Sequence, residues 1–178
     1  MKGVEKCVKD EKLLKKIHLG DENAAEELIN RYYVSIFRYC KAHCSNLAKA
    51  EDLTQETFLR VFKNLPEYRE KGCFRTYIYT IANHLCIDES RKIQLYPLEN
   101  EEELVCDDDA MIQVENKAEI KYLLSKLSPE QKEVVILRYG EQLSFGEIAK
   151  VTGCNMRTVQ SRVRNALKIM RKEQKNEG

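Results

Sequence analysis

The 178-residue sequence has no tryptophan and few of the residues that interrupt helices, with three prolines and seven glycines. It has no apolar run near the roughly 18 residues that a membrane-spanning helix needs. It also lacks the charged start and apolar core of a signal peptide. We therefore expect a cytoplasmic protein. A charged fraction of 33% beside 43% hydrophobic residues suits a soluble helical protein with a packed core.

The seven cysteines form no C-x-x-C pair, and their number is odd. Cys40, His43 and Cys44 could begin a metal site, but no second ligand pair follows at a matching spacing. Buried or incidental thiols are the preferred interpretation, because a disulfide framework does not fit a cytosolic location. We expect no metal and no cofactor.

The net charge of +1 hides an asymmetry along the chain. Residues 96–119 carry nine acidic and one basic side chain, whereas residues 120–178 carry 12 basic and six acidic ones. The acidic runs 101–103 and 107–109 disfavour packing and predict a flexible linker. We expect a first domain at 1–95, an acidic linker at 96–112 and a second domain at 113–178. No period-two strand pattern appears, so the predicted fold is all-α, with two small helical domains.

Residues 144–172 show the pattern of a helix-turn-helix. Ser144 and Glu147 form a capping box, Gly153 fits a turn that needs positive φ, and Asn155 can cap a second helix. The second helix presents a basic face opposite its apolar one. Such a helix lies in the DNA major groove. An ordinary helical hairpin with solvated charges is the alternative.

Three helices are expected in the first domain after a short apolar stripe within residues 1–20. They run from a capping box at Asn23 and Glu26 to about His43, from about 48 to 64, and from 74 to 92. The second helix carries an outward polar stripe, which is either a solvated face or a partner site. In the second domain, Ser128 caps a helix that ends at Gly140.

The loop at 66–73 mixes an aromatic residue with basic ones. Such a loop can hold an unstacked base by stacking and phosphate contact, although charged loops are also ordinary surface features. On the following helix, His84 is best explained as a surface residue, and Asp88 with Arg91 as a local ion pair.

Residues 50–65 and 74–92 resemble region 2 of bacterial extracytoplasmic-function (ECF) sigma factors, and residues 127–167 resemble their region 4. Both stretches occur in the family's order. The resemblance implies an alternative sigma subunit that binds core RNA polymerase and recognises the −10 and −35 promoter elements. It also implies control by an anti-sigma factor, which can be membrane-bound, in response to an envelope or stress signal. It implies no enzymatic activity and no small-molecule substrate.

The resemblance also assigns residues to these contacts. The polymerase-binding motif D-x-x-Q-E corresponds to Asp52, Gln55 and Glu56. The −10 element, where a base is flipped, corresponds to Tyr68, Arg69, Lys71, Arg75, Tyr79 and Asn83. Asn83 could equally be a structural hydrogen-bonding residue. The −35 helix offers Arg157, Thr158, Gln160, Ser161 and Arg164 to base edges, with Arg162, Asn165 and Lys168 beside them.

The sequence departs from the family pattern at several positions. Thr80 and His84 replace residues that are often basic, which predicts weaker phosphate contact along the −10 helix. Asn165 stands where arginine is common, which predicts a shifted −35 preference.

Two other functions compete with the sigma interpretation. A dimeric operator-binding regulator would need an apolar dimerisation helix, and an enzyme would need a phosphate loop, a ligand set or a nucleophile–base pair. The sequence offers none of these features.

Overall fold

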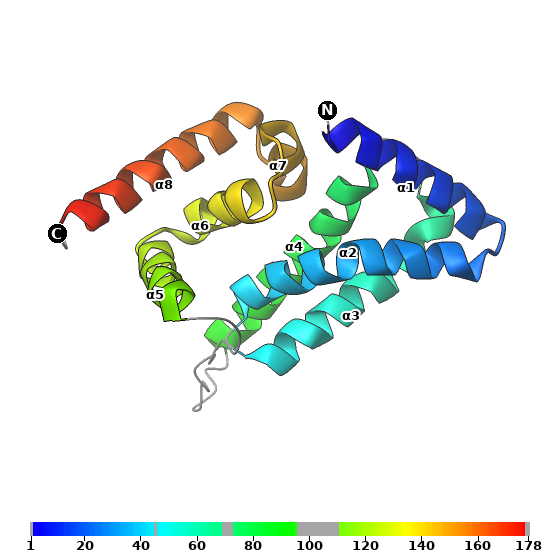
Figure 1. Cartoon of the computed structure of the whole chain (residues 1–178), viewed down its shortest axis with the longest axis horizontal. Helices are drawn as coiled ribbons and strands as arrows, with labels where there is room; N and C mark the ends of the chain where they lie inside the picture. The colour runs from blue at the N-terminus through cyan, green and yellow to red at the C-terminus, as the bar shows by residue number, and fades with distance from the viewer. Residues whose placement is uncertain (1, 45, 69–72, 96–110, 177–178) are drawn as a thin grey trace. The chain divides into compact units, whose positions relative to one another are not determined.

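The computed structural model describes residues 2–44, 46–68, 73–95 and 111–176, and every regular element within these ranges is helical. Contacts divide the chain into two units, Met1–Leu104 and Val105–Gly178. The division falls inside the range predicted for the linker, residues 96–110 of which lie outside the described ranges. The helical fold class agrees with the prediction (Figure 1).

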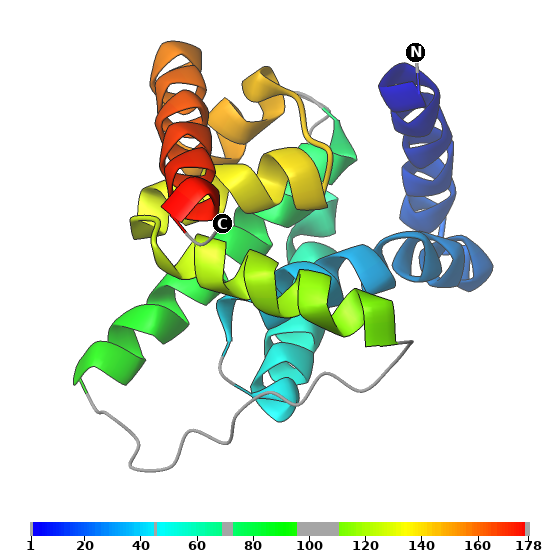
Figure 2. The ribbon, with the colours of Figure 1, turned by 60° about the vertical axis from the view of Figure 1, so that its left-hand side comes forward.

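The first unit contains α1 (Lys2–His18), α2 (Glu22–His43), α3 (Leu47–Asn64), the 3-10 turn η1 (Leu65–Glu67) and α4 (Phe74–Leu95). Helices α2, α3 and α4 pack against one another, and α1 packs on α2 and α4 (Figures 1 and 2). Their shared core is fully buried at Leu28, Tyr32, Ile36, Val61 and Ile78. Burying each such side chain contributes about 1.5–3 kcal/mol, so the three helices hold a stable scaffold beneath their outer faces.

Helix α2 begins earlier than predicted. Its N-cap is Asp21, whose side chain accepts a hydrogen bond from the Ala24 amide at 3.1 Å, so the predicted box at Asn23 and Glu26 is wrong. Gly20 has a φ of +86°, which turns the chain directly into Asp21. Because aspartate and asparagine cap equally well, composition alone did not distinguish the two positions.

The second unit contains α5 (Met111–Ser125), α6 (Pro129–Val135), the π-turn η2 (Ile136–Gly140), α7 (Phe145–Thr152) and α8 (Met156–Asn176). Its longest helix, α8, contacts α5, α6 and α7 (Figure 2). Ser128 caps α6 as predicted, and Gln131 completes a capping box with it. The helix after it widens into η2, where the Glu141 amide donates to the Ile136 carbonyl at 3.0 Å. Tyr139 in η2 is 55% exposed.

The helix-turn-helix is confirmed in its local chemistry. The Ser144 amide donates to Glu147 Oε2 at 2.8 Å, and the Glu147 amide donates to Ser144 Oγ at 3.3 Å. Gly153 adopts a φ of +65°, and the Thr158 amide donates to Asn155 Oδ1 at 2.8 Å. The inner face of α8 is buried at Val159, Val163 and Ala166. The turn therefore holds α8 rigidly against α7.

Among Cys40, Cys44, Cys73, Cys86 and Cys154, which the structure describes, one differs from the prediction. Cys40, Cys44, Cys86 and Cys154 are free thiols, but Cys73 forms a disulfide, so the interpretation of all cysteines as incidental thiols is wrong there. Within the described ranges, no group of three or more His, Cys, Asp or Glu side chains could hold a metal ion. No described helix is both long and apolar enough to cross a bilayer.

Candidate nucleic-acid and partner interfaces

The outer face of α3 carries the predicted polymerase-binding residues. Asp52 and Gln55 are exposed, and Glu56 is half-exposed. Glu56 accepts a hydrogen bond from Arg60 Nε at 2.7 Å, an exposed pair that contributes about 0.3–0.5 kcal/mol. The opposite face is buried through Thr54 and Thr57, so the helix cannot rotate without losing its core contacts.

Sequence reasoning missed an apolar side chain on the same face. Leu59, three residues after Glu56, is 66% exposed. On α2, Val34 is also exposed, and Tyr33 stacks on Phe58 of α3 with ring centroids 6.1 Å apart. A single exposed leucine is an ordinary surface feature, so Leu59 matters here only because it shares the face of Asp52, Gln55 and Glu56. The sequence did contain a signal for this side chain, because Leu59 is an apolar residue three positions after Glu56 within the polar stripe.

The predicted −10 element is built around an aromatic cluster. Tyr68 caps η1, and its ring centroid lies 4.5 Å from that of Tyr77 and 6.1 Å from that of Phe74. Phe74 in turn meets Tyr32 edge-on at 5.5 Å. These contacts join the end of the 3-10 turn to the first turn of α4. They hold Tyr68 half-buried, with part of its ring at the surface.

Only some of the predicted −10 residues lie at this surface. Arg75 is half-buried, and its guanidinium carbon lies 5.9 Å from the centroid of the Tyr79 ring. Arg69 and Lys71 lie outside the described residues. Tyr68 therefore belongs to the cluster with Phe74 and Tyr77, whereas Arg75 lies over the Tyr79 ring, whose aromatic neighbour is Tyr39.

Tyr79 and Asn83 lie inside the bundle and not on its surface, and their DNA contacts stay predictions. Tyr79 is fully buried and meets Tyr39 edge-on, with centroids 5.4 Å apart. Asn83 is 3% exposed and accepts a hydrogen bond from the Tyr39 hydroxyl at 3.3 Å. A buried amide with a partner contributes to the packing of the core, which is the structural role that the sequence allowed for Asn83.

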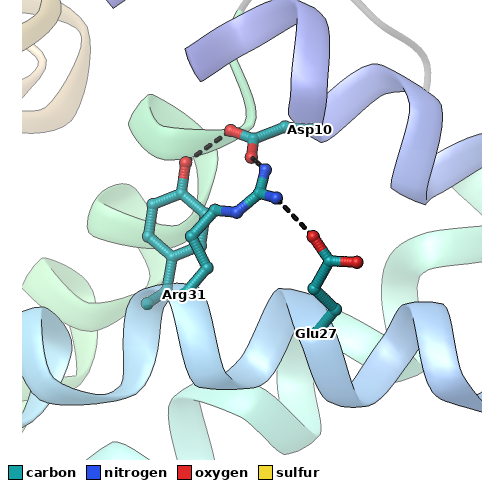
Figure 3. Close-up of polar contacts among 4 residues, drawn as sticks. Asp10, Glu27 and Arg31 are labelled. Atoms are coloured by element: carbon teal, nitrogen blue, oxygen red, sulfur yellow. Dashed lines mark hydrogen bonds and ion pairs between the residues drawn. The ribbon is translucent and has the colours of Figure 1, made fainter.

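A polar cluster beside this element was not predicted from the sequence (Figure 3). Asp10 of α1 is 1% exposed, and it accepts from Arg31 Nη1 at 2.7 Å and from the Tyr32 hydroxyl at 2.5 Å. Arg31 also donates to Glu27 at 2.7 Å. Burial, followed by the hydrogen bond and charge of Asp10, raises the pKa of Tyr32, and Arg75 opposes that shift. The cluster therefore fastens α1 to the bundle close to the first turn of α4.

The outer face of α8 presents most of the predicted −35 residues. The exposed ones are Arg157, Ser161, Arg164, Asn165 and Lys168, and Thr158 and Gln160 are half-exposed. The Thr158 hydroxyl also donates to Asn155 Oδ1 at 3.1 Å. Arg162 lies apart from this face, because its Nη1 lies 3.1 Å from the Cys154 sulfur in the turn. Arg162 therefore braces the turn, while the others line an open basic face.

Two family models match the chain in the order of its units. The model for Sigma-70 region 2 matches residues 13–95, and that for Sigma-70 region 4 matches residues 117–170. The ECF RNA polymerase sigma factor SigC of Mycobacterium tuberculosis is 30% identical over 151 residues, which cover 83% of this chain and 81% of the relative. The chain belongs to the ECF sigma factors. It is therefore a transcription initiation factor and not an enzyme.

Other relatives of this sigma factor agree. The ECF RNA polymerase sigma factor SigW of Bacillus subtilis is 28% identical over 177 residues, covering 91% of this chain and 95% of the relative. The fold is similar to that of CnrH in complex with the cytosolic domain of CnrY, with a TM-score of 0.76 at 19% identity over 96% of this chain and 99% of that one. It is also similar to RpoE in complex with the anti-sigma factor NepR from Bartonella quintana, at a TM-score of 0.71 and 22% identity over 84% and 96% of the two chains.

The family models place the sigma factor's three surfaces in two different regions. The polar face of α3 and the aromatic cluster around Tyr68 fall within region 2, and the basic face of α8 falls within region 4. Each surface stands on a buried scaffold that fixes its side chains. Side chains fixed in this way can recognise a partner with little rearrangement.

Proposed function

We propose that this sigma factor docks on core RNA polymerase through the face of α3 formed by Asp52, Gln55, Glu56 and Leu59. The exposure of this face above a buried core is the observation that supports it. Carboxylates select a basic partner surface, and Leu59 supplies apolar area that association would remove from water. The docked protein would act in the cytoplasm, where polymerase and promoter meet.

Promoter recognition is divided between the two units in this proposal. Tyr68 and Arg75 contact unpaired DNA of the −10 element, with Arg69 and Lys71 as further candidates. The −35 duplex is read by α8, where Arg157, Gln160, Ser161 and Arg164 reach base edges and Lys168 reaches a phosphate. Thr158 and Asn165 flank these contacts, while Arg162 acts through the turn. The exposure of this face on a rigid helix supports the assignment.

An anti-sigma factor controls the protein in the same proposal, and an envelope or stress signal releases it. The similar folds of CnrH and RpoE were solved with CnrY and with the anti-sigma factor NepR, which motivates this part. A partner that covers the α3 face would exclude polymerase directly.

Core binding by variants of the α3 face tests the docking proposal. Asp52→Ala combined with Gln55→Ala should weaken the affinity for core polymerase at least tenfold in a fluorescence titration. Glu11→Ala removes the same charge from an exposed site on α1 and should leave the affinity unchanged. Equal affinity for the double variant and the Glu11 control would assign docking to another surface.

A further inference from the structure

Two thiols meet in the core of the first unit, apart from the faces proposed for polymerase and promoter. Cys40 of α2 is fully buried, and Cys86 of α4 is 2% exposed. Both cysteines are reduced, and their side chains are hydrogen-bonded to each other. Such a hydrogen bond already places the two sulfur atoms in contact, and a disulfide would bring them to about 2.05 Å.

The register of α2 against α4 is fixed beside these thiols. The hydroxyl of Tyr39, the residue before Cys40, donates to Asn83 Oδ1 at 3.3 Å, and its ring meets that of Tyr79 edge-on at 5.4 Å. Asn83 lies three residues before Cys86 on the same helix. Because protein cores are close-packed, these contacts keep the two sulfur atoms facing each other across the helix interface.

Cys40 is the better nucleophile of the two cysteines at the end of α2. The hydrogen bond with Cys86 lowers the pKa of the Cys40 thiol, burial opposes this shift, and a hydrogen bond with Thr54 supports it. Cys44 lies one turn later, and burial followed by the charge of Cys40 raises its pKa to about 12. Since the thiolate is the nucleophilic form, Cys40 supplies the attacking sulfur.

The end of α2 provides a route for a small oxidant to reach Cys40. The helix ends at His43, and Cys44 is its C-cap, with an extended backbone at a φ of −111° and a ψ of 153°. Cys40 therefore belongs to the last turn of the helix. Terminal turns open locally at a lower free energy than the middle of a bundle, and hydrogen peroxide is small enough to enter such an opening.

We propose that Cys40 and Cys86 are an oxidation site, at which a peroxide produces a disulfide between α2 and α4. The Cys40 thiolate attacks one oxygen of hydrogen peroxide, the O–O bond breaks, and the other oxygen leaves as hydroxide, which takes up a proton and becomes water. The Cys86 sulfur then attacks the sulfenic acid on Cys40, loses its proton and expels a second water. Two thiols are oxidised to one disulfide while one peroxide is reduced to two waters.

The bond would have two consequences for the first unit. It would close a covalent ring over residues 40–86, which includes the whole of α3. Because a cross-link restricts the unfolded chain, oxidation should stabilise the bundle that supports the α3 face. The second thiol would also trap Cys40 in a form that thiols can reduce, before further peroxide converts it irreversibly to a sulfinic acid.

Peptide mapping of the folded full-length protein tests the site directly. The protein would be treated with hydrogen peroxide, blocked with N-ethylmaleimide and digested with trypsin, which separates the three cysteines into peptides 39–41, 42–49 and 76–91. We expect peptides 39–41 and 76–91 to be linked, at their summed mass less two hydrogen atoms, and to separate with dithiothreitol. A bond from 39–41 to 42–49, unmodified Cys40 and Cys86, or a link that forms only in urea would overturn the proposal.

Variants identify the role of each sulfur. In Cys86→Ala, peroxide should convert Cys40 to a sulfinic acid, seen as a gain of two oxygen atoms on peptide 39–41. Cys44→Ala is the matched control and should form the same link as the wild type, so loss of the link there would contradict the role of Cys40. This control and the wild-type map decide the question even if Cys86→Ala does not fold.

Thermal unfolding measures the effect on stability. Peroxide should raise the midpoint of the wild type by at least about 4 °C relative to Cys86→Ala treated in the same way. Equal changes in the two proteins would contradict a stabilising cross-link. Neither measurement involves polymerase or DNA, so the oxidation site and the proposed function stand or fall separately.

Discussion

Asp10 on α1 and Arg31 on α2 form an ion pair of 2.7 Å in which the carboxylate is almost completely buried. Because the Tyr32 hydroxyl donates to the same carboxylate, removing Asp10 would leave two donors without their acceptor. We expect Asp10→Ala to lower the free energy of unfolding by about 2–4 kcal/mol, near the lower end for a broken buried pair because Arg31 is partly exposed.

Urea denaturation of the full chain measures this loss. Glu27→Gln is the matched control, since Glu27 contacts the same Arg31 but is 60% exposed. We expect that control to lose no more than about 0.5 kcal/mol. Similar losses in both variants would mean that burial does not set the strength of the Asp10 contact.

Tyr32 makes stability depend on alkaline pH. Its raised pKa means that the folded chain keeps the phenol proton at pH values where an unfolded tyrosine, with a pKa of about 10, loses it. The stability that this difference provides is fully present below pH about 10 and is lost as the pH rises further. Urea midpoints between pH 8 and 11 should fall more steeply for the wild type than for Tyr32→Phe. Parallel curves would contradict the shift.

Gly153 and Gly146 provide a matched pair in the helix-turn-helix. A Cβ would meet nothing within 4 Å at either position, but only Gly153 has a positive φ. We expect Gly153→Ala to cost about 1–2 kcal/mol because of the left-handed backbone. Gly146→Ala, inside α7, should be neutral or stabilise by up to about 1 kcal/mol. Thermal unfolding of the two variants checks the sign, and a destabilised Gly146→Ala would refute the backbone explanation.

Structural features were predictable from the sequence where the interacting residues lie close together along the chain. Ser144, Glu147, Gly153 and Asn155 act within a few residues of one another, so their spacing indicated the helix-turn-helix. The ion pair of Asp10 and Arg31 joins positions 21 residues apart. No local pattern identifies such a pair among the many charges of a chain that is one-third charged.

Tyr79 and Asn83 show why the buried faces of a helix are hard to identify from the sequence alone. Helix α4 contacts α1, α2 and α3, so its buried arc is wider than one apolar stripe. Tyr39 then satisfies the Asn83 side chain inside the core. The polar side chain of Asn83 therefore suggests an exposed position when only the sequence is considered, whereas in the structure it is buried beside Tyr39.

The Tyr39–Asn83 contact allows a direct test of the structural role of Asn83. Asn83→Ala should destabilise the fold by about 1–3 kcal/mol, the cost of an unsatisfied buried group. A double-mutant cycle with Tyr39→Phe should show a coupling of about 0.5–1.5 kcal/mol in urea denaturation. Zero coupling, together with weaker promoter binding by the folded Asn83→Ala protein, would restore Asn83 to the DNA surface.

Cys44 should react slowly with alkylating reagents. Burial, with smaller effects from Cys40 and Glu89, raises the pKa of its thiol to about 12, so little thiolate exists at pH 8.5. Iodoacetamide should modify Cys44 at least about tenfold faster in urea than in the folded chain. Mass spectrometry of the peptide that carries Cys44 gives both rates, and equal rates would contradict the shift.

Genome-wide transcription in vitro tests the sigma function most directly. Fragmented genomic DNA would be transcribed by bacterial core polymerase with and without the protein, and RNA 5′ ends would be mapped. We predict discrete start sites that appear only when both components are present and that share two upstream elements, with the start sites lost for Asp52→Ala combined with Gln55→Ala. An unchanged set of 5′ ends on addition of the protein, under conditions where a known sigma factor directs initiation, would contradict the assignment.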